Sequence, residues 1–175
     1  GDGSALVSID SSGRILTWEG PLGAPAVEEN LGGPLAAAAF DASVSRIATL
    51  GQDGQVRVWD LGSAQELQSL GPVDNGAFAV ALSNDGTLVA AGDGTGVRIW
   101  SVSGEAGQEL QGYWQDPEAE EGWKGHTKAV TALAFSPDNE LLASGSADTT
   151  VMFWELETGE IRWPAEGHWA TVTSM

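Results

Sequence analysis

A histidine, a serine and an aspartate lie close together in the stretch GHTKAVTALAFSPDNELLASGSADTTVMFWEL, which runs from Gly125 to Leu156. His126, Ser144 and Asp148 are the residue types of a hydrolase triad, in which serine attacks a carbonyl carbon, histidine takes its proton and aspartate orients the histidine. The same residue types can also form a closed hydrogen-bond network, because a buried carboxylate and a buried imidazole both need partners. The elements that hold these side chains decide between the two interpretations.

Four segments of the chain end in a similar apolar strand that carries a tryptophan. They are GRILTW at Trp18, GQVRVWD at Trp59, GVRIW at Trp100 and TVMFWE at Trp154, with spacings of 41, 41 and 54 residues. Within each period an apolar run leads to a turn, a second apolar run, a second turn and then the strand with tryptophan. Short strands at regular spacing, separated by Gly, Asp, Asn and Ser, predict an all-β protein. A period near 40 residues with four strands per unit is typical of a propeller blade.

The stretch from Gly125 to Leu156 resembles a unit of the WD-repeat β-propeller family: Gly125 and His126 open it, SPDN forms the first hairpin and FWE closes it. The second repeat carries a literal WD pair at Trp59 and Asp60. The resemblance covers essentially the whole chain, so residues 1–175 are expected to form one propeller segment of about four blades, each with four antiparallel strands. It implies a central channel and use as a platform for interactions.

The resemblance also implies a structural hydrogen-bond tetrad in the fourth repeat, made of His126, Ser144, Asp148 and Trp154. One repeat earlier the same offsets recur at Thr49, Asp53 and Trp59. Catalysis needs its residues once, whereas a repeat architecture needs the same internal bonds in every unit, so recurrence favours architecture. We therefore predict that the chain is not an enzyme and that it uses no metal and no cofactor.

The other repeats depart from this pattern. Leu31 and Val73 stand where the second and third repeats would need a histidine. In the third repeat, Ala90 and Gly94 replace the serine and the aspartate, and in the first repeat Ser12 replaces the aspartate. We expect these blades to depend on packing more than on the tetrad.

The repeat pattern is incomplete on both sides. The first repeat lacks its own first strand, and residues 167–175 begin a further repeat whose WATVTSM matches TKAVTAL of the fourth repeat. Three arrangements fit this pattern: a partial propeller whose other blades belong to a longer parent, two copies that complete one eight-bladed ring, or four blades that close on themselves. We favour the partial propeller, and the match between the two incomplete repeats keeps the homodimeric ring as the alternative.

The last interval is longer because QGYWQDPEAEEGWK, residues 111–124, is inserted in a loop that the family places on the top face of the propeller. The candidate partner-binding residues in this insertion are Tyr113, Trp114, Asp116, Glu118, Glu120, Glu121 and Trp123. Aromatic side chains among carboxylates could anchor a basic peptide; the alternative is a solvated loop whose tryptophans fold back on the blade. Trp163 and Trp169 flank the next equivalent loop; we expect them to pack between blades, and the alternative is that they extend this aromatic and acidic patch.

Composition limits the classes of partner. The chain has 25 Asp and Glu against 7 Lys and Arg, and its net charge of -18 repels nucleic acid and acidic membranes. It has no cysteine, its two histidines lack a third ligand at metal spacing, and no leader or long apolar run is present, which favours the cytoplasm. We predict a noncatalytic protein–protein interaction scaffold. The alternative is a sensor or regulatory propeller segment of a longer signalling enzyme of the kinase or ATPase type.

Overall fold

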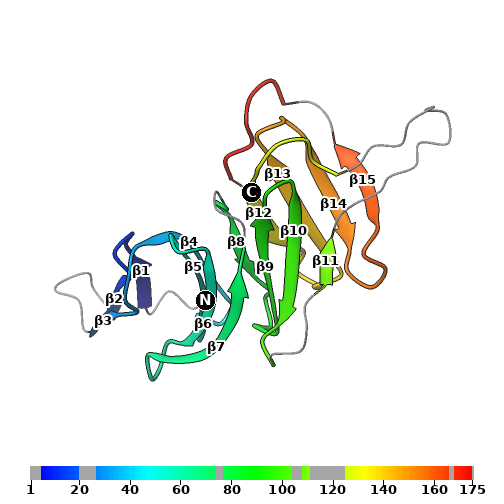
Figure 1. Ribbon diagram of the computed structural model, residues 1–175. Helices are drawn as coiled ribbons and strands as arrows, with labels where there is room; N and C mark the ends of the chain where they lie inside the picture. Colours follow the sequence, from blue (N-terminus) through cyan, green and yellow to red (C-terminus); the bar gives the residue numbers. More distant parts are fainter. Residues whose placement is uncertain are drawn as a thin grey trace, which may run out of the picture.

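The computed structural model describes residues 5–19, 27–73, 77–103, 108–110, 125–165 and 168–174, and its regular elements are all β-strands, so the all-β prediction is confirmed. The strands form four antiparallel sheets (Figure 1). Sheet one contains β1 (Ala5–Ile9), β2 (Arg14–Glu19) and β3 (Val27–Asn30); sheet two contains β4 (Leu35–Phe40), β5 (Arg46–Gly51), β6 (Gln55–Asp60) and β7 (Gln65–Pro72). Sheet three contains β8 (Val80–Leu82), β9 (Leu88–Asp93), β10 (Gly96–Ser101) and β11 (Gln108–Leu110); sheet four contains β12 (Val130–Phe135), β13 (Leu141–Ser146), β14 (Val151–Glu155) and β15 (Ile161–Ala165). Within the described ranges, no helix is long and apolar enough to cross a membrane.

The tryptophan-bearing strands show why these segments fold as strands. In β6, Val56 and Val58 are fully buried, whereas Arg57 between them is partly exposed. The strand β10 repeats this alternation, with Arg98 between two buried apolar residues. Because successive side chains of a strand point to opposite faces, the two-residue period places the buried apolar row on one face, where a neighbouring sheet can cover it, and the arginine on the other face.

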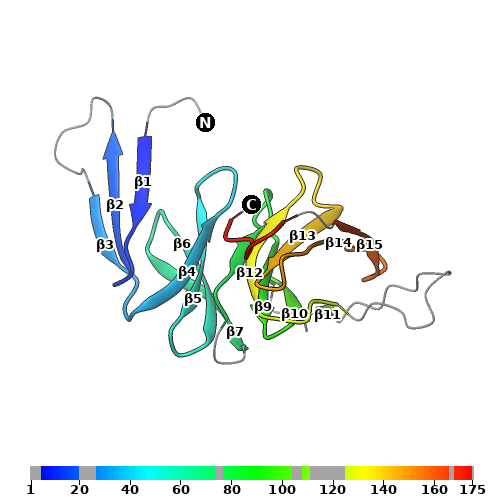
Figure 2. The same cartoon turned by 90° about the horizontal axis from the view of Figure 1, so that it is seen from above.

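The sheets follow one another in chain order, with sheet one at one end of the molecule and sheet four at the other (Figures 1 and 2). Each is a simple meander in which consecutive strands pair. Sheets two, three and four have the expected four strands, and their first strands β4, β8 and β12 lie on the inner side, where β8 contacts both β4 and β12. In sheet one the described residues supply only the second, third and fourth strands.

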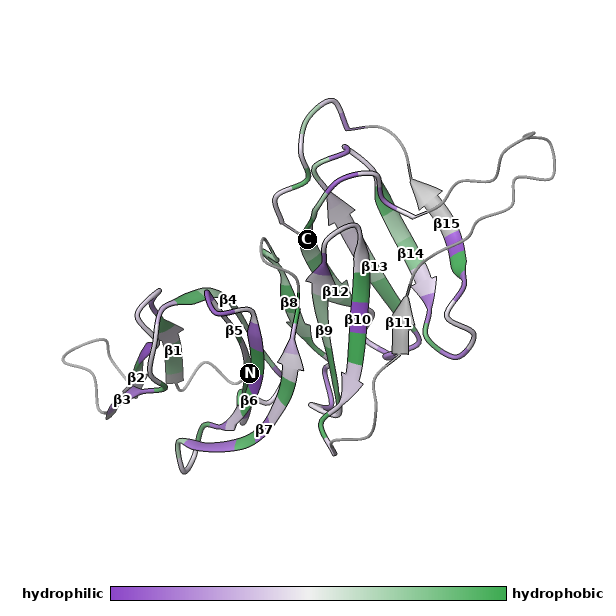
Figure 3. Cartoon of the chain, in the orientation of Figure 1, coloured by the Kyte–Doolittle hydropathy of each residue, from purple (hydrophilic) through white to green (hydrophobic). Residues whose placement is uncertain are grey.

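The hydrophobic core lies between neighbouring sheets and not inside any one of them. One apolar cluster joins sheets three and four and includes Leu142, Met152 and Trp154, and a second joins sheets two and three. The cluster between sheets one and two is smaller, with Ile15, Leu31 and Ile47 as its buried members. Figure 3 shows the same distribution, with hydrophobic residues along β10 and β14 and hydrophilic residues on β3 and at many of the turns.

The turn between the first and second strands is held by a hydroxyl and a carboxylate two residues apart. These positions hold Asp41 and Ser43 in sheet two, Ser83 and Asp85 in sheet three, and Ser136 and Asp138 in sheet four. In sheet three the Ser83 hydroxyl donates to Asp85 at 2.6 Å and accepts the Leu88 N–H at 2.9 Å. In sheet two the roles are exchanged: the Ser43 hydroxyl donates to Asp41 at 2.5 Å, and Asp41 accepts the backbone N–H of the second strand. The network is kept although the two residue types have changed places.

Candidate functional site

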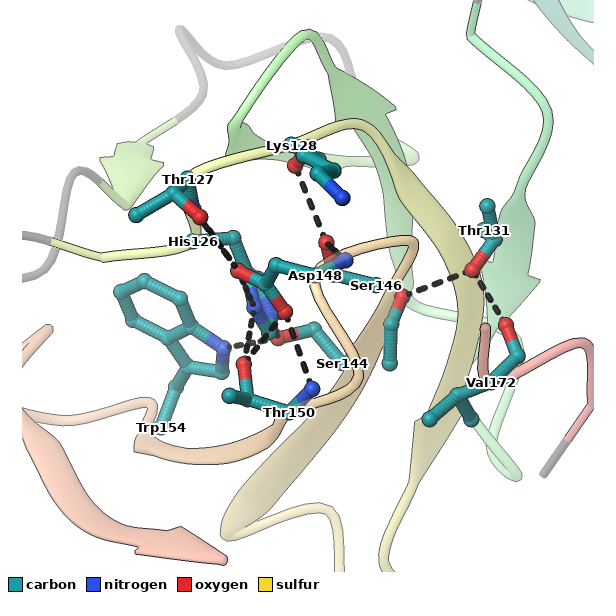
Figure 4. Close-up of polar contacts among 11 residues, drawn as sticks. His126, Thr127, Lys128, Thr131, Ser144, Ser146, Asp148, Thr150, Trp154 and Val172 are labelled. Carbon is teal, nitrogen blue, oxygen red and sulfur yellow. Dashed lines mark hydrogen bonds and ion pairs between the residues drawn. The ribbon is translucent and has the colours of Figure 1, made fainter. Parts of the chain in front are cut away.

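Four side chains of sheet four meet beside the loop that precedes β12 (Figure 4). His126 lies in that loop, Ser144 on β13, Asp148 in the following turn and Trp154 on β14. Nε2 of His126 is 2.7 Å from Oγ of Ser144, and the indole N–H of Trp154 donates to the same oxygen at 2.7 Å. Nδ1 of His126 is 3.4 Å from a carboxylate oxygen of Asp148. The structure thus brings together the four residues named for the tetrad in this repeat.

Two threonines that the sequence reasoning missed complete this network. The hydroxyl of Thr150 donates to Asp148 at 2.6 Å and lies 2.9 Å from Nδ1 of His126. The backbone N–H of Thr127 donates to the other oxygen of Asp148 at 2.7 Å. The signal for Thr150 was the Asp-x-Thr spacing, because an aspartate at the start of a turn commonly binds the residue two positions later.

The hydrogen-bond donors fix one arrangement of protons. The Thr150 hydroxyl proton points to Asp148, so its oxygen accepts from His126, which places the imidazole proton on Nδ1. Nε2 of His126 then accepts the hydroxyl proton of Ser144, whose oxygen accepts from Trp154. Every polar atom of the network is therefore satisfied with a neutral histidine and an ionised aspartate.

Burial and hydrogen bonding favour those same protonation states. Burial lowers the pKa of His126 below its ordinary value of 6.5, because a buried imidazolium is poorly solvated, and the attraction to Asp148 only partly opposes this shift. Burial alone would raise the pKa of Asp148, but the hydrogen bonds from Thr150 and Thr127 outweigh it and lower that pKa to about 2.

The network resembles a catalytic triad in its contacts but is closed to a substrate. Ser144 and His126 are both buried, and the indole of Trp154 covers the serine oxygen with its N–H. A nucleophile must reach a carbonyl carbon and needs donors for the developing oxyanion, and the contacts of Ser144 leave no such position. The arrangement can hold together a loop, two strands and the turn between them.

Sheet two forms only part of the network, and one of its predicted members lies elsewhere. The indole N–H of Trp59 donates to Oγ1 of Thr49 at 2.9 Å, which matches the contact of Trp154 with Ser144. Asp53 does not join this pair: its carboxylate binds the guanidinium of Arg57 at 2.9 Å, and its side chain is 54% exposed. The preceding loop has no histidine that could pair with a buried aspartate. Asp53 therefore stays at the surface, where it pairs with Arg57.

In sheet three, as in sheet two, an arginine of the third strand pairs with an aspartate. Arg98 occupies the position of Arg57 on its strand and binds Asp93 at 2.5 Å, while Ala90 offers no hydroxyl to Trp100. Arg98 also donates to the Pro72 carbonyl at 3.1 Å, which links the strand to the preceding loop. In these sheets an arginine of the third strand partners the turn carboxylate, whereas in sheet four histidine has that role.

The residues that replace histidine are buried and apolar. Leu31 packs in the cluster between sheets one and two, and Val73 packs in the cluster between sheets two and three. Their backbone N–H groups donate to the carbonyls of Gly13 and Gly54, at 3.0 and 2.9 Å. The loop entering each sheet is therefore tied to the turn of the sheet before it even where the tetrad is incomplete.

These loops and turns define one edge of the molecule, which we call the loop face. It consists of residues 31–34, 77–79, 125–129 and 168–171 together with the turns at 10–13, 52–54, 93–95 and 147–149. The insertion 111–124, with its seven candidate binding residues, lies outside the described residues. Two large apolar side chains are exposed here: Phe78, at 59%, and Trp169, at 100%.

The exposure of both aromatics differs from what the sequence indicates. Trp169 was expected to pack between blades, but its side chain is fully exposed to solvent. Phe78 sits in the apolar run AFAVAL, which reads as a buried strand, yet β8 begins only at Val80. The side chain of Trp163 lies outside the described residues. The described residues contain no group of His, Asp or Glu that could hold a metal ion.

Comparison with known proteins identifies the repeats. The family model described as WD domain, G-beta repeat, matches residues 65–101 and 119–155. The first match begins with β7 and ends with β10, and the second ends with β14, so each ends on a tryptophan-bearing strand.

The chain is similar to longer proteins with such repeats. It is 27% identical over 160 residues to Target of rapamycin complex subunit wat1 of Schizosaccharomyces pombe, covering 89% of this chain and 48% of that protein. It is 31% identical over 123 residues to WD repeat-containing protein 18 of Danio rerio, covering 68% of this chain and 28% of that protein. The solved structure of U3-55K superposes with a TM-score of 0.65 at 21% identity, covering 80% of this chain and 41% of that one.

The chain therefore spans about half, or less, of the length of these proteins. The structural similarity to U3-55K concerns the fold, which in this chain consists of four consecutive meander sheets of three or four strands. The family model, the curated relatives and the fold all lead to one assignment. The chain belongs to the WD-repeat β-propeller family.

Proposed function

We propose that this protein is a noncatalytic protein-interaction scaffold and that it binds its partner on the loop face. The observation that carries this proposal is the exposure of two large aromatic side chains, Phe78 and Trp169, in equivalent loops of that face. Aromatic residues dominate the energetics of protein interfaces, because each buries a large apolar area at little cost in conformational entropy. An isolated aromatic side chain that is fully exposed is a poor choice for stability alone.

The charge of the chain favours a basic partner. With a net charge of -18, the molecule attracts cationic segments and repels nucleic acid and anionic lipid. Asp10 and Asp53 add exposed carboxylates to the loop face: that of Asp10 accepts hydrogen bonds from Ser12 in its own turn, and that of Asp53 is paired with Arg57. The seven aromatic and acidic residues of the insertion would extend the same combination of side chains. We propose a lysine- and arginine-rich protein segment as the ligand class.

The enclosure of Ser144 supports the noncatalytic part of the proposal. Ser144 is enclosed by His126 and Trp154, which satisfy its hydroxyl group in both directions. The first relative is by its name a subunit of a complex, which is in keeping with a binding role. A regulatory segment of a longer signalling enzyme would use the same binding face, so the two readings differ in the parent chain and not in the chemistry of this site.

A peptide-binding experiment tests the proposal. A panel of synthetic peptides rich in Lys and Arg, and a matched panel with Glu at those positions, would be titrated while the fluorescence of the tryptophans is followed. We expect a subset of the basic peptides to bind, and Phe78→Ala and Trp169→Ala to weaken their binding about tenfold or more each. Leu67→Ala is the matched control, because Leu67 is an exposed apolar residue on β7, away from the loop face. Equal losses for all three variants, or no preference for basic peptides, would contradict the proposal.

A further inference from the structure

The two halves of the loop face present exposed charges of opposite sign. Asp10 in the turn of sheet one and Asp53 in the turn of sheet two are exposed carboxylates. In the turns of sheets three and four the carboxylates are turned inward, and the side chains of Asp93 and Asp148 are only 8% and 7% exposed. Lys128, in the loop before β12, is exposed. Sheets one and two therefore offer carboxylates to a ligand, whereas sheet four offers an ammonium group.

Lys128 differs from the described arginines, because it has no ionic partner among the residues that the structure describes. Each described arginine is engaged: Arg14 binds Glu28, Arg57 binds Asp53, Arg98 binds Asp93, Arg162 binds Glu155, and Arg46 donates to the carbonyl of Gly86. The chain has 25 Asp and Glu, so carboxylates are not scarce. The ammonium group of Lys128 can therefore bind an anion that comes from outside the chain.

The loop that carries Lys128 is held in place through its backbone. The carbonyl of Lys128 accepts the hydroxyl of Ser146 at 3.0 Å (Figure 4). On either side of it, the N–H of Thr127 donates to Asp148 at 2.7 Å, and the carbonyl of Ala129 accepts the N–H of Ala147 at 3.0 Å. None of these bonds uses the side chain of Lys128. A ligand can therefore bind this side chain without reordering the loop, which lowers the entropic cost of binding.

Lys128 also has a defined place relative to the other groups of the loop face. Asp53 belongs to sheet two, Phe78 lies in the loop that leads into sheet three, and Lys128 lies in the loop that leads into sheet four. The first strands β8 and β12 of the last two sheets are in contact. The order across the loop face is thus a carboxylate, an aromatic side chain and an ammonium group. Packed sheets lie about 10 Å apart and an extended chain advances about 3.3–3.6 Å per residue, so each step spans about three residues of a ligand.

We infer that the ligand of the loop face is a mixed-charge protein segment, in which the carboxylate of an acidic side chain pairs with Lys128. Its basic side chains lie over Asp10 and Asp53, and an apolar side chain between the two ends contacts Phe78. This inference rests on the proposed binding of a protein segment to the loop face, and it adds where the acidic residue of that segment lies.

The negative net charge of the chain does not prevent this pairing. In about 0.1 M salt, exposed charges are screened beyond about 10 Å, so the adjacent ammonium group outweighs the more distant carboxylates. Opposite charges at the two ends of the binding surface also fix the direction in which the segment lies. Lys128 is therefore a specificity-determining residue, and its exchange should alter which peptide is preferred.

A charge exchange between protein and ligand tests the pairing. The probes are labelled peptides with lysine, leucine and glutamate about three positions apart, in that order and in the reverse order, and the same peptides with lysine in place of glutamate. Fluorescence anisotropy gives the dissociation constants for the unaltered chain and for Lys128→Glu. For one of the two orders, we expect Lys128→Glu to shift the ratio of the two constants about tenfold or more in favour of the lysine peptide.

Arg162→Glu is the matched control, because it changes the net charge by the same amount on β15, where Arg162 pairs with Glu155 at the end of β14 remote from the loop face. We expect it to shift the ratio less than about twofold. The melting temperature of Lys128→Glu should stay unchanged, since only the backbone of Lys128 is bonded within the fold. Equal shifts in both variants, or no shift in Lys128→Glu, would overturn the pairing.

Phe78→Ala distinguishes a failure of the pairing from a failure of the proposed function. If Phe78→Ala weakens the binding of every peptide while Lys128→Glu shifts no preference, the binding face stands and the pairing with Lys128 is overturned. If no peptide binds, or if Phe78→Ala leaves all of them unaffected, the proposed function is contradicted and the pairing is overturned with it.

Discussion

The indole N–H of Trp154 donates a 2.7 Å hydrogen bond to Oγ of Ser144, and this bond joins β14 to β13 inside sheet four. In sheet two, Trp59 makes the same bond to Thr49 at 2.9 Å. The histidine that completes the network in sheet four is replaced in sheet two by the apolar Leu31, so the tryptophan contact survives where the rest is lost. The hydrogen bond between the tryptophan and the hydroxyl therefore links the second and third strands by itself. The histidine and the aspartate additionally link the preceding loop to these strands.

Asp148→Asn should destabilise the fold much more than Asp53→Asn, although the two residues hold equivalent positions. Asp148 accepts hydrogen bonds from Thr150 and Thr127 in a buried network, and an amide cannot accept all of them. We expect a loss of about 1–3 kcal/mol for Asp148→Asn and less than about 0.5 kcal/mol for the exposed Asp53. Urea unfolding followed by tryptophan fluorescence measures both, and equal losses would contradict the assignment.

Acid should weaken the fold in two windows. The folded-state pKa of Asp148, about 2, is below its ordinary value of 3.8, so its contribution is complete above pH 3.8 and is lost as the pH falls toward 2. Its side chain is only 7% exposed, and the difference corresponds to about 2 kcal/mol. The pKa of His126 is also lowered, here by burial, so its contribution is complete above pH 6.5 and falls below that value.

Single variants distinguish the contributions of Asp148 and His126 from the general effect of acid on the many other carboxylates. The difference in unfolding free energy between the unaltered chain and Asp148→Asn should shrink between pH 4 and pH 2. For His126→Asn the difference should already shrink below pH 6.5. Chemical denaturation at a series of pH values checks both, and differences that stay constant with pH would show that these groups are not buried as described.

In the first turn of sheet two, Asp41 and Ser43 stand in the reverse order of their counterparts in sheet three. Two substitutions can restore the order found in sheet three. Asp41→Ser alone removes the carboxylate that holds the turn and should cost about 1–2 kcal/mol. Adding Ser43→Asp recreates the arrangement of Ser83 and Asp85 in sheet three, and we expect the double variant to regain most of that loss. Thermal unfolding of the three chains measures the recovery. A double variant no more stable than Asp41→Ser would mean that the turn of sheet two needs its carboxylate at the first position.

Val44 should be replaceable by glycine with a gain in stability. Its φ is positive, at 56°, and its counterparts Gly86 and Asn139 also have a positive φ, at 68° and 59°. Of these three residues only Val44 is β-branched. A left-handed conformation costs an ordinary residue about 1–2 kcal/mol, and glycine avoids most of this cost. We expect Val44→Gly to stabilise the fold by about 0.5–1 kcal/mol, while Leu67→Gly, at an exposed strand position, destabilises it. Loss of stability for Val44→Gly would contradict the assigned turn.

The sequence predicted the fold because its strands repeat. The tryptophans at 41-residue spacing and the alternating residues around them mark the third strand of each sheet, and the short Gly- and Asp-containing segments mark the turns. These features are local, so that one sequence is enough to read them.

The details that were missed depend on competition between partners. Asp53 has the spacing of a tetrad member, but its position depends on whether a histidine or Arg57 pairs with it, and that choice requires the folded sheet. Trp169 looks like a core residue by type, yet the chain at that point lies outside the packed sheets. Thr150 was overlooked because a second hydroxyl beside a histidine has no periodic signal.

The central claim is that the histidine, serine and aspartate of sheet four hold the structure and do no chemistry, and Ser144→Ala tests it most directly. Hydrolysis of p-nitrophenyl acetate and urea unfolding would be measured on the unaltered chain, on Ser144→Ala and on the exposed control Ser69→Ala. We predict no hydrolysis above buffer in any of them and a loss of about 1–3 kcal/mol for Ser144→Ala alone, because His126 and Trp154 lose a buried partner. Hydrolysis that disappears in Ser144→Ala while its stability is unchanged would contradict the account.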